Sequence, residues 1–262
     1  MKYIVLSFDD GRKDFYTNAF PILKKYQLKA TLNVVTGFLG RNDLPVFASA
    51  NYACLSTDEM KECAVYGIEI ANHSVNHTND LEQIIRGTEF IYNHLKTEQE
   101  IGFASPSSEI SKKNIDKYKV LIKSNKVLYI RSGNQIKRDG LYYAGLYILY
   151  RASKSKKLFN LYNKRNIICP NNELEFYPSI TCSADNTMDQ IISFIQRIPD
   201  EHAAIIMFHS ILNPFDLGWG KDKWYNSVSD FENLCDYLAK KKNNISVITN
   251  AELCGMSTML LS

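Results

Sequence analysis

The chain has 262 residues, of which 45% are hydrophobic and 23% are charged, so it can bury a full core as one α/β barrel or as two small domains. Its formal net charge of +3 comes from 31 basic and 28 acidic residues scattered along the chain, so a nucleic-acid partner is not implied. Six widely spread cysteines without a C-x-x-C pair argue against a disulfide framework or a zinc knuckle.

The N-terminus opens on Met1-Lys2 and runs directly into an apolar segment that breaks at Asp9. Such a run is too short for the core of a signal peptide or for a membrane span. No linker rich in glycine, serine or proline divides the chain. We therefore expect a cytoplasmic protein with a single domain over residues 1–262.

Apolar runs typical of strands alternate with segments of helical periodicity along most of the chain. In chain order, they predict a strand at 3–6, a helix at 13–26, a strand at 30–35, a helix at 57–66, a strand at 68–71, a helix at 81–95, a strand at 101–104, a helix at 112–123, a strand at 127–130, a helix at 188–198, a strand at 203–208, a helix at 231–240 and a strand at 245–248. Ser56 is the expected N-cap of the second helix. Repeated strand-then-helix units predict a mostly parallel sheet.

Residues 141–180 interrupt this alternation. The segment is rich in tyrosine, has little helical period and carries Cys169-Pro170-Asn171-Asn172 as a turn signal. We interpret it as a hairpin insertion with loops. Four tyrosines that alternate imperfectly are expected to pack across this hairpin: Tyr142, Tyr143, Tyr147 and Tyr150.

Two adjacent carboxylates, Asp9 and Asp10, stand at the carboxyl end of the first predicted strand. Gly11 follows and allows a sharp turn of the backbone. In α/β barrels the reacting groups lie at this end of the strands, and neighbouring carboxylates point in different directions, so one can bind a metal while the other handles a proton. Taken alone, the same three residues are more typical of a simple turn.

A pair of histidines, His73 and His77, follows the third predicted strand. The four-residue spacing places both imidazoles on one side of a helical turn, where they can share one ion. The chain has only five histidines, so two at ligand spacing directly after a strand indicate metal binding. Two imidazoles and one carboxylate leave coordination positions open, as in catalytic zinc sites.

The strand predicted at 203–208 ends in His209. This histidine is placed to act as an acid, although a histidine at a strand end is often only a hydrogen-bonded cap. His94 and His202 belong to no such group of residues and are interpreted as structural or surface residues.

These motifs together resemble the polysaccharide deacetylase family, also called carbohydrate esterase family four or the NodB homology domain. The family's opening motif is similar to residues 7–11, its second motif to residues 67–77 and its last motif to residues 206–209. The similar segments follow one another in the expected order across nearly the whole chain.

The resemblance implies a distorted (β/α) barrel of about seven parallel strands. It also implies one divalent metal ion held by Asp10, His73 and His77. Asp9 would act as the general base and His209 as the general acid when an N-acetyl group is hydrolysed to acetate and a free amine. Zinc is the expected ion, and cobalt, nickel or manganese also fit such a site.

The third motif departs from the family pattern. An arginine followed by prolines is usual there and orients the catalytic aspartate, whereas this chain has Ala104, Ser105 and Pro106. The branch of the family that acts on poly-N-acetylglucosamine also has an alanine at that place, so the chain is more similar to that branch. Arg131, at the end of the next strand, either supplies a cation from another direction or is an ordinary surface arginine.

Several further residues are candidates for substrate contact. Trp219 and Trp224 lie in a glycine-containing loop after His209, where flat side chains either stack on a sugar ring or pack the loop. Ile206 either lines a pocket for the acetyl methyl group or belongs to the core. Arg131 and Pro106 complete the expected set.

The sequence leaves three functions open. The first is a metal-dependent hydrolase that removes N-acetyl groups from an amino sugar, an oligosaccharide or a polysaccharide precursor. The second is a hydrolase of a non-sugar amide or cyclic imide. The third is a carbohydrate-binding protein of the same fold that has lost turnover.

Overall fold

The computed structural model describes residues 1–42, 53–97, 99–110, 114–133, 140–170, 176–221 and 223–259, with side chains up to residue 256. The turn expected at Asn171 and Asn172 lies outside these residues. In the described residues, the main sheet has the strand order β5-β4-β3-β2-β1-β7-β6, and β10 also pairs with β1. The strands of this sheet are β1 (Lys2–Phe8), β2 (Thr31–Val34), β3 (Glu69–Asn72), β4 (Phe103–Ala104), β5 (Ile130–Arg131), β6 (Ser179–Thr181), β7 (Ala203–Phe208) and β10 (Ile245–Ile248).

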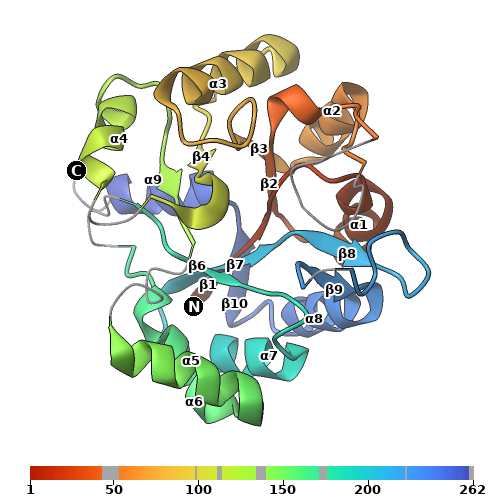
Figure 1. Ribbon diagram of the computed structural model, residues 1–262, viewed down its shortest axis with the longest axis vertical. Helices are drawn as coiled ribbons and strands as arrows, with labels where there is room; N and C mark the ends of the chain where they lie inside the picture. The colour runs from red at the N-terminus through yellow and green to blue at the C-terminus, as the bar shows by residue number, and fades with distance from the viewer. Residues whose placement is uncertain are drawn as a thin grey trace.

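All pairings in this sheet are parallel, and β1 lies at its centre (Figure 1). One edge of β1 pairs with β7 along most of its length, while the other edge pairs first with β10 and then with β2. The outer strands meet because Arg131 on β5 forms a parallel bridge with Tyr177, just before β6. The sheet is therefore a nearly closed barrel of seven parallel strands, as expected, with β10 beside β1. A separate two-stranded sheet is formed by β8 (Ser210–Leu212) and β9 (Tyr225–Ser227).

Helices surround the strands in Figure 1. The α-helices are α1 (Phe20–Tyr26), α2 (Thr57–Tyr66), α3 (Leu81–Leu95), α4 (Ile115–Lys123), α5 (Leu141–Ser153), α6 (Lys156–Asn163), α7 (Met188–Arg197), α8 (Val228–Lys240) and α9 (Asn250–Met259). Short turns of other helix types are η1 (Phe15–Ala19), η2 (Thr36–Phe38), η4 (Pro106–Ser108) and η6 (Lys164–Asn166). In the described residues, no helix is long and apolar enough to cross a membrane.

Local signals explain why the helices at 57–66 and 81–95 begin where the sequence predicts. The side chain of Ser56 accepts a hydrogen bond from the Glu59 amide, and the Glu59 side chain accepts one from the Ser56 amide, which forms a capping box. Asp80 caps α3 in a similar way by accepting from the amides of Glu82 and Gln83. The segment at 13–26 differs, because the π-helical turn η1 occupies its first half before α1 begins.

The prediction of a hairpin at 141–180 is wrong. This segment contains two α-helices, α5 and α6, followed by β6. Tyr143, Tyr147 and Tyr150 recur at the spacing that lines one face of a helix. The ring of Tyr150 packs against those of Phe159 and Tyr162 on α6, with centroids 5.3 and 5.1 Å apart. The imperfect alternation of tyrosines was therefore helical periodicity.

The hydrophobic core has one layer inside the barrel and one between the strands and the outer helices. Successive residues of β7 belong to the two layers in turn, because side chains alternate along a strand. Ile205 belongs to a small cluster with Val5 and Tyr129, whereas Ile206 belongs to the main cluster with the residues of α7 and α8. This alternation fixes which side chains at the strand ends can face the barrel axis.

Candidate metal centre and active site

The turn after β1 positions Asp9 and Asp10. The amide of Asp9 still donates to the carbonyl of Phe208 on β7, at 2.9 Å. The next two residues turn into the left-handed region, with φ of 76° at Asp10 and 65° at Gly11. A Cβ at Gly11 would also lie only 3.2 Å from side-chain carbons of Leu55 and Val34. Glycine therefore fits the turn that separates the directions of the two carboxylates.

The loop after β3 carries His73 and His77, but the expected helical turn is absent from it. His77 has a left-handed φ of 60°, and the loop is held by side chains instead. Asn72 Oδ1 accepts from the Ser74 amide at 2.7 Å, and Ser74 Oγ accepts from the Thr78 amide at 2.9 Å. These bonds satisfy the backbone in place of helical ones, so the two imidazoles meet by loop geometry rather than by helical spacing.

The side chains of Asp10, His73 and His77 converge on one point. Nε2 of each histidine lies 3.5 Å from Asp10 Oδ1, and the three ligand atoms all lie within 4.8 Å of one another. Two ligands that are each about 2.1 Å from a tetrahedral ion are about 3.4 Å apart, which matches the observed spacing. Asp10 Oδ1 is also buried and has no hydrogen-bond partner in the described part of the chain. The three residues therefore fit a divalent metal ion.

Neighbouring groups fix the protonation and orientation of these candidate ligands. His73 Nδ1 lies 2.8 Å from the Ala104 carbonyl, which favours a proton on Nδ1 and leaves the Nε2 lone pair for a metal. Burial lowers the pKa of His77 to about 4, so its imidazole is neutral near pH 7. Burial by itself raises the pKa of Asp10, but Arg12 and His73 outweigh it and hold this pKa well below its usual range. Asp10 and His77 are thus in the form that binds a cation, and the contact with the Ala104 carbonyl turns Nε2 of His73 toward them.

Arg12 is a residue of this site that the sequence analysis missed. Its side chain is buried, and both Nε and Nη2 contact Asp10 Oδ2, at 2.9 and 2.8 Å. Its Nη1 donates at 2.9 Å to the Oγ of Ser210, the residue that follows His209 in the chain. Arg12 thus engages the oxygen of Asp10 that faces away from the histidines. An arginine beside Asp-Asp-Gly gives no signal of this contact in the sequence, because Ser210 is distant along the chain.

The carboxylate of Asp9 is held on the other side by Arg131. Asp9 Oδ1 accepts from Arg131 Nη2 at 2.5 Å and from Asn33 Nδ2 at 2.8 Å. Burial alone raises the pKa of Asp9, but Arg131 and His73 outweigh burial, so the net pKa lies below its ordinary value. Arg131 is fully buried, so the interpretation as a surface arginine is wrong. A polar Asn33 within an apolar strand was the signal that could have indicated the second contact.

The position of Arg131 explains the departure in the third motif. Arg131 on β5 is paired in register with Ala104 on β4, the residue that stands where the family pattern has an arginine. Paired residues of parallel strands share a face of the sheet. The cation that reaches the aspartate is therefore supplied from the neighbouring strand.

His209 follows β7, and its ring lies beside Trp224, with centroids 5.1 Å apart. Its Nδ1 is buried and has no hydrogen-bond partner among the residues described. Burial lowers the pKa of His209, and the charges of Asp10 and Asp9 oppose this effect only in part. The imidazole is thus close to both carboxylates. The other tryptophan, Trp219, packs on Tyr225 at 4.9 Å.

The remaining candidates lie in different surroundings. Ile206 is fully buried in the main hydrophobic cluster, so the structure places it in the core rather than on the side of the site. Pro106 is buried in η4, and its carbonyl accepts from Asn79 Nδ2 at 3.0 Å. His94 stacks on Phe90 within α3, and His202 bonds to a neighbouring backbone carbonyl, away from the site.

Residues 1–121 match the family model described as polysaccharide deacetylase. These residues belong to the polysaccharide deacetylase family. A Bacillus subtilis (strain 168) protein that carries the name of this family is 36% identical over 76 residues, which are 29% of this chain and 24% of that protein. A poly-beta-1,6-N-acetyl-D-glucosamine N-deacetylase of Staphylococcus aureus (strain MSSA476) is 34% identical over 79 residues, or 30% of this chain and 24% of that enzyme. The match thus spans about a quarter of each relative.

Solved structures of low sequence identity share the fold. A peptidoglycan N-acetylglucosamine deacetylase is 15% identical with a TM-score of 0.51, over 96% of this chain and 87% of that one. The Xyl-CE4 domain of a multidomain xylanase from the hindgut metagenome of Trinervitermes trinervoides is 15% identical with a TM-score of 0.50, over 98% of this chain and 91% of that domain. The barrel of this chain is therefore similar to theirs over nearly its full length.

Proposed function

We propose that this chain is a metal-dependent hydrolase that removes N-acetyl groups from an amino sugar, an oligosaccharide or a polysaccharide precursor. The observation that carries the proposal is the convergence of Asp10, His73 and His77 on one point, next to an Asp9 that Arg131 holds. The names of the Staphylococcus relatives support a substrate built from N-acetylglucosamine.

A divalent ion at this point would polarise the amide carbonyl and make water acidic enough to attack near neutral pH. The proton transfers fall to two side chains of the protein. The bonds from Arg131 and Asn33 both end on Oδ1 of Asp9, which leaves Oδ2 to take up the proton released during attack. His209, directly after β7, the strand beside β1, would protonate the departing amine nitrogen, so that acetate and a free amine result.

The ligand set also bears on the choice of metal. Two imidazoles and one carboxylate are typical of catalytic zinc sites that keep positions open for water and substrate. The same donors accept cobalt, nickel or manganese when these ions are supplied. We propose zinc as the resident ion.

The test combines metal analysis with acetate release. The full chain is stripped with a chelator, reloaded with zinc, and assayed on N-acetylglucosamine oligomers and on nucleotide sugars. We expect about one equivalent of bound zinc and acetate release that depends on it. Bound metal without turnover on any amide would favour a carbohydrate-binding protein. Turnover on non-sugar amides alone would favour a hydrolase of a non-sugar amide or cyclic imide. A carefully prepared protein that binds no divalent metal would overturn the proposal.

A further inference from the structure

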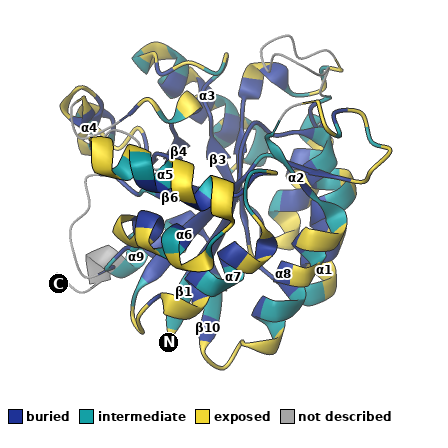
Figure 2. Cartoon of the chain, turned by 60° about the horizontal axis from the view of Figure 1, so that its bottom comes forward, coloured by how far each residue is buried: buried dark blue, intermediate teal, exposed yellow. Residues whose placement is uncertain are grey.

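The outward face of α5 is apolar. The exposed fractions are 92% for Leu141, 63% for Tyr142, 65% for Ile148 and 55% for Leu149. Their spacing along the chain places them on one face of the helix, and Figure 2 shows this face turned outward as exposed residues. Exposed apolar residues are normal when single, but a contiguous stripe on a helix marks a contact surface.

The opposite face of α5 already packs on the protein. Leu146 and Tyr150 are buried there, and Tyr147 lies against Tyr162 of α6, with ring centroids 5.7 Å apart. The outward stripe is therefore not needed to hold the helix in place. A helix that is apolar on both faces usually has a partner on each.

Positive charge is concentrated in the segment that contains α5 and α6, although the net charge of the whole chain is only +3. No aspartate or glutamate occurs between residues 140 and 172. Six basic residues lie in that stretch: Arg151, Lys154, Lys156, Lys157, Lys164 and Arg165. With a net charge of +3 for the chain, the remainder carries −3. Within this stretch, Arg151 pairs with Asp185 and Lys156 with Asp189.

The basic residues flank the apolar stripe at both ends. Lys154, Lys156 and Lys157 are exposed directly after the last turn of α5. At the other end, the guanidinium of Arg165, which follows α6, lies 4.2 Å from the ring centroid of Tyr143 near the start of α5. An apolar helix face bordered by lysine and arginine is the pattern of helices that lie in the interface of an anionic bilayer.

From this pattern we infer that the outward face of α5, with its flanking basic residues, docks on the surface of an anionic lipid bilayer. A second copy of the chain fits less well, because a symmetric interface would bring the same positively charged patch together with itself. The contact is peripheral, since in the described residues no helix is able to span a membrane. This inference does not depend on the proposed hydrolase activity.

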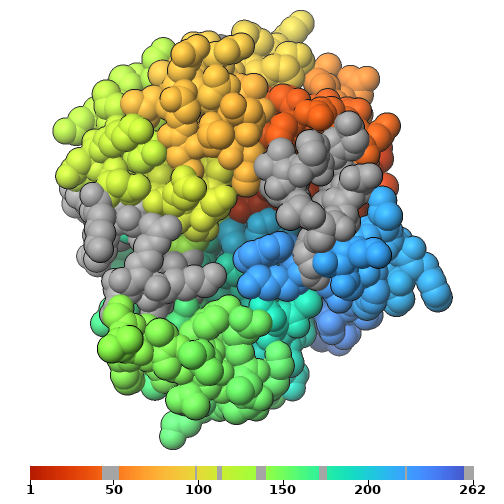
Figure 3. Space-filling view, viewed as in Figure 1, coloured from red at the N-terminus to blue at the C-terminus, as the bar shows by residue number. Residues whose placement is uncertain are grey.

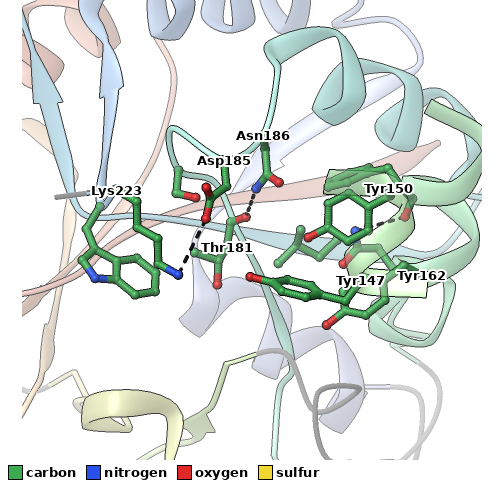
Figure 4. A pocket seen from close by; sticks show the side chains of 12 residues that line it. Tyr147, Tyr150, Tyr162, Thr181, Asp185, Asn186 and Lys223 are labelled. Atoms are coloured by element: carbon green, nitrogen blue, oxygen red, sulfur yellow. Dashed lines mark hydrogen bonds and ion pairs between the residues drawn. The ribbon is translucent and has the colours of Figure 1, made fainter. Parts of the chain in front are cut away.

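The same helices line a pocket that lies next to the candidate active site. Figure 4 shows a pocket with Tyr147 and Tyr150 of α5 on one side and Lys223 on the other. Trp224, which also lines this pocket, packs on His209. In Figure 3 the green helices α5 and α6 lie at the lower edge of the molecule. Docking through α5 would thus hold this pocket, next to the candidate site, close to the lipid surface.

The test is vesicle flotation with the full chain. Vesicles of phosphatidylcholine that contain phosphatidylglycerol are compared with vesicles of phosphatidylcholine alone, at low and at high salt. We expect binding only to the anionic vesicles, and weaker binding at high salt. Lys157→Ala and Lys164→Ala are each expected to lower the partition coefficient about fivefold.

The double variant Ile148→Glu/Leu149→Glu is expected to abolish flotation, because it places two carboxylates in the stripe. Val65→Glu is the matched control: Val65 is 90% exposed on α2, so this variant should float like the parent protein. Thermal unfolding verifies that each variant is folded. Absence of flotation with the parent protein, equal binding to neutral vesicles, or flotation that survives the double variant would each overturn the inference. So would a stable dimer, detected by light scattering, that the double variant dissociates.

Discussion

Arg131 on β5 is paired with Ala104 on β4, and its guanidinium reaches the carboxylate of Asp9 on β1 at 2.5 Å. The two charged residues are 122 positions apart in the chain, and both are almost completely buried. Removing one member of a buried ion pair leaves the other charge without compensation, which costs more than the pair itself contributes.

Arg131→Met is therefore expected to lower the free energy of unfolding by about 3–5 kcal/mol. It should also reduce kcat/KM for acetate release by about 100-fold, because Asp9 loses the group that orients it. Urea unfolding and the acetate assay measure the two effects. Asp9→Asn/Arg131→Met removes both charges and should be more stable than Arg131→Met alone. If the double variant is the less stable of the two, the pair is not coupled as described.

The pairing with Ala104 makes a rescue experiment possible. In the Arg131→Ala variant, an arginine introduced at position 104 would extend from the neighbouring strand β4, on the same face of the sheet as the original side chain. We expect kcat/KM of Ala104→Arg/Arg131→Ala to be at least about tenfold higher than that of Arg131→Ala, because the new arginine would again orient Asp9. Ala104→Arg in the parent background is the control and should be destabilising, because a second cation would be buried beside the first. Equal activity of the single and double variants would contradict this interpretation.

Metal binding and proton transfer are expected to separate by mutation. Asp9→Asn should retain the metal and lose about 100-fold or more in activity, because Asp9 is the proposed base and not a ligand. His77→Ala should lose both, since it removes one of three ligand atoms that lie within 4.8 Å of one another. Metal content after gel filtration and acetate release provide the two measurements. Full activity of Asp9→Asn would remove this residue from the mechanism.

Arg12 acts on Asp10 in two opposite ways. Its two contacts with Oδ2 fix the direction of the carboxylate, while its positive charge disfavours a nearby cation. We expect orientation to dominate, so Arg12→Lys, which keeps the charge but not the two-point contact, should weaken zinc binding about tenfold. Competition with a chelator measures the affinity without reference to turnover. Tighter binding in Arg12→Lys would show that the two contacts do not position Asp10.

A glycine in α3 is expected to matter for the histidine loop. Alanine in place of a helical glycine normally stabilises by about 1 kcal/mol. At Gly87, however, a Cβ would lie 2.4 Å from Asn72 Oδ1, the atom that accepts from the Ser74 amide. Gly87→Ala should therefore destabilise the protein by about 1–3 kcal/mol and weaken metal binding.

Gly145→Ala in α5 is the matched control for this prediction. A Cβ at Gly145 has no neighbour within 4 Å, so the substitution should stabilise by about 0.5–1 kcal/mol. Thermal or urea unfolding of both variants measures the difference. A stabilising Gly87→Ala would mean that the Asn72 side chain moves without cost and is not needed in its present place.

Much of the fold was predictable because its signals are local. The helices 57–66 and 81–95 have the predicted ends, since Ser56 and Asp80 cap them through hydrogen bonds within one turn. The strands at 203–208 and 245–248 were likewise predicted with their observed bounds. The strand predicted at 101–104 is shortened to 103–104, and the one predicted at 127–130 is displaced to 130–131, because pairing with neighbours sets their extent.

The sequence by itself determined the parallel order of the strands, because strand and helix signals alternate along the chain. Its motifs indicated the barrel by family resemblance, and they indicated five candidate residues, Asp9, Asp10, His73, His77 and His209, because each follows a predicted strand and parallel strands end on the same side. Only the tertiary structure decided what surrounds them. It brought Arg131 to Asp9 and Arg12 to Ser210, and replaced the expected helical turn after His73 by a loop. Such contacts join residues on separate strands, so their distances depend on the register and closure of the barrel, which no local pattern specifies.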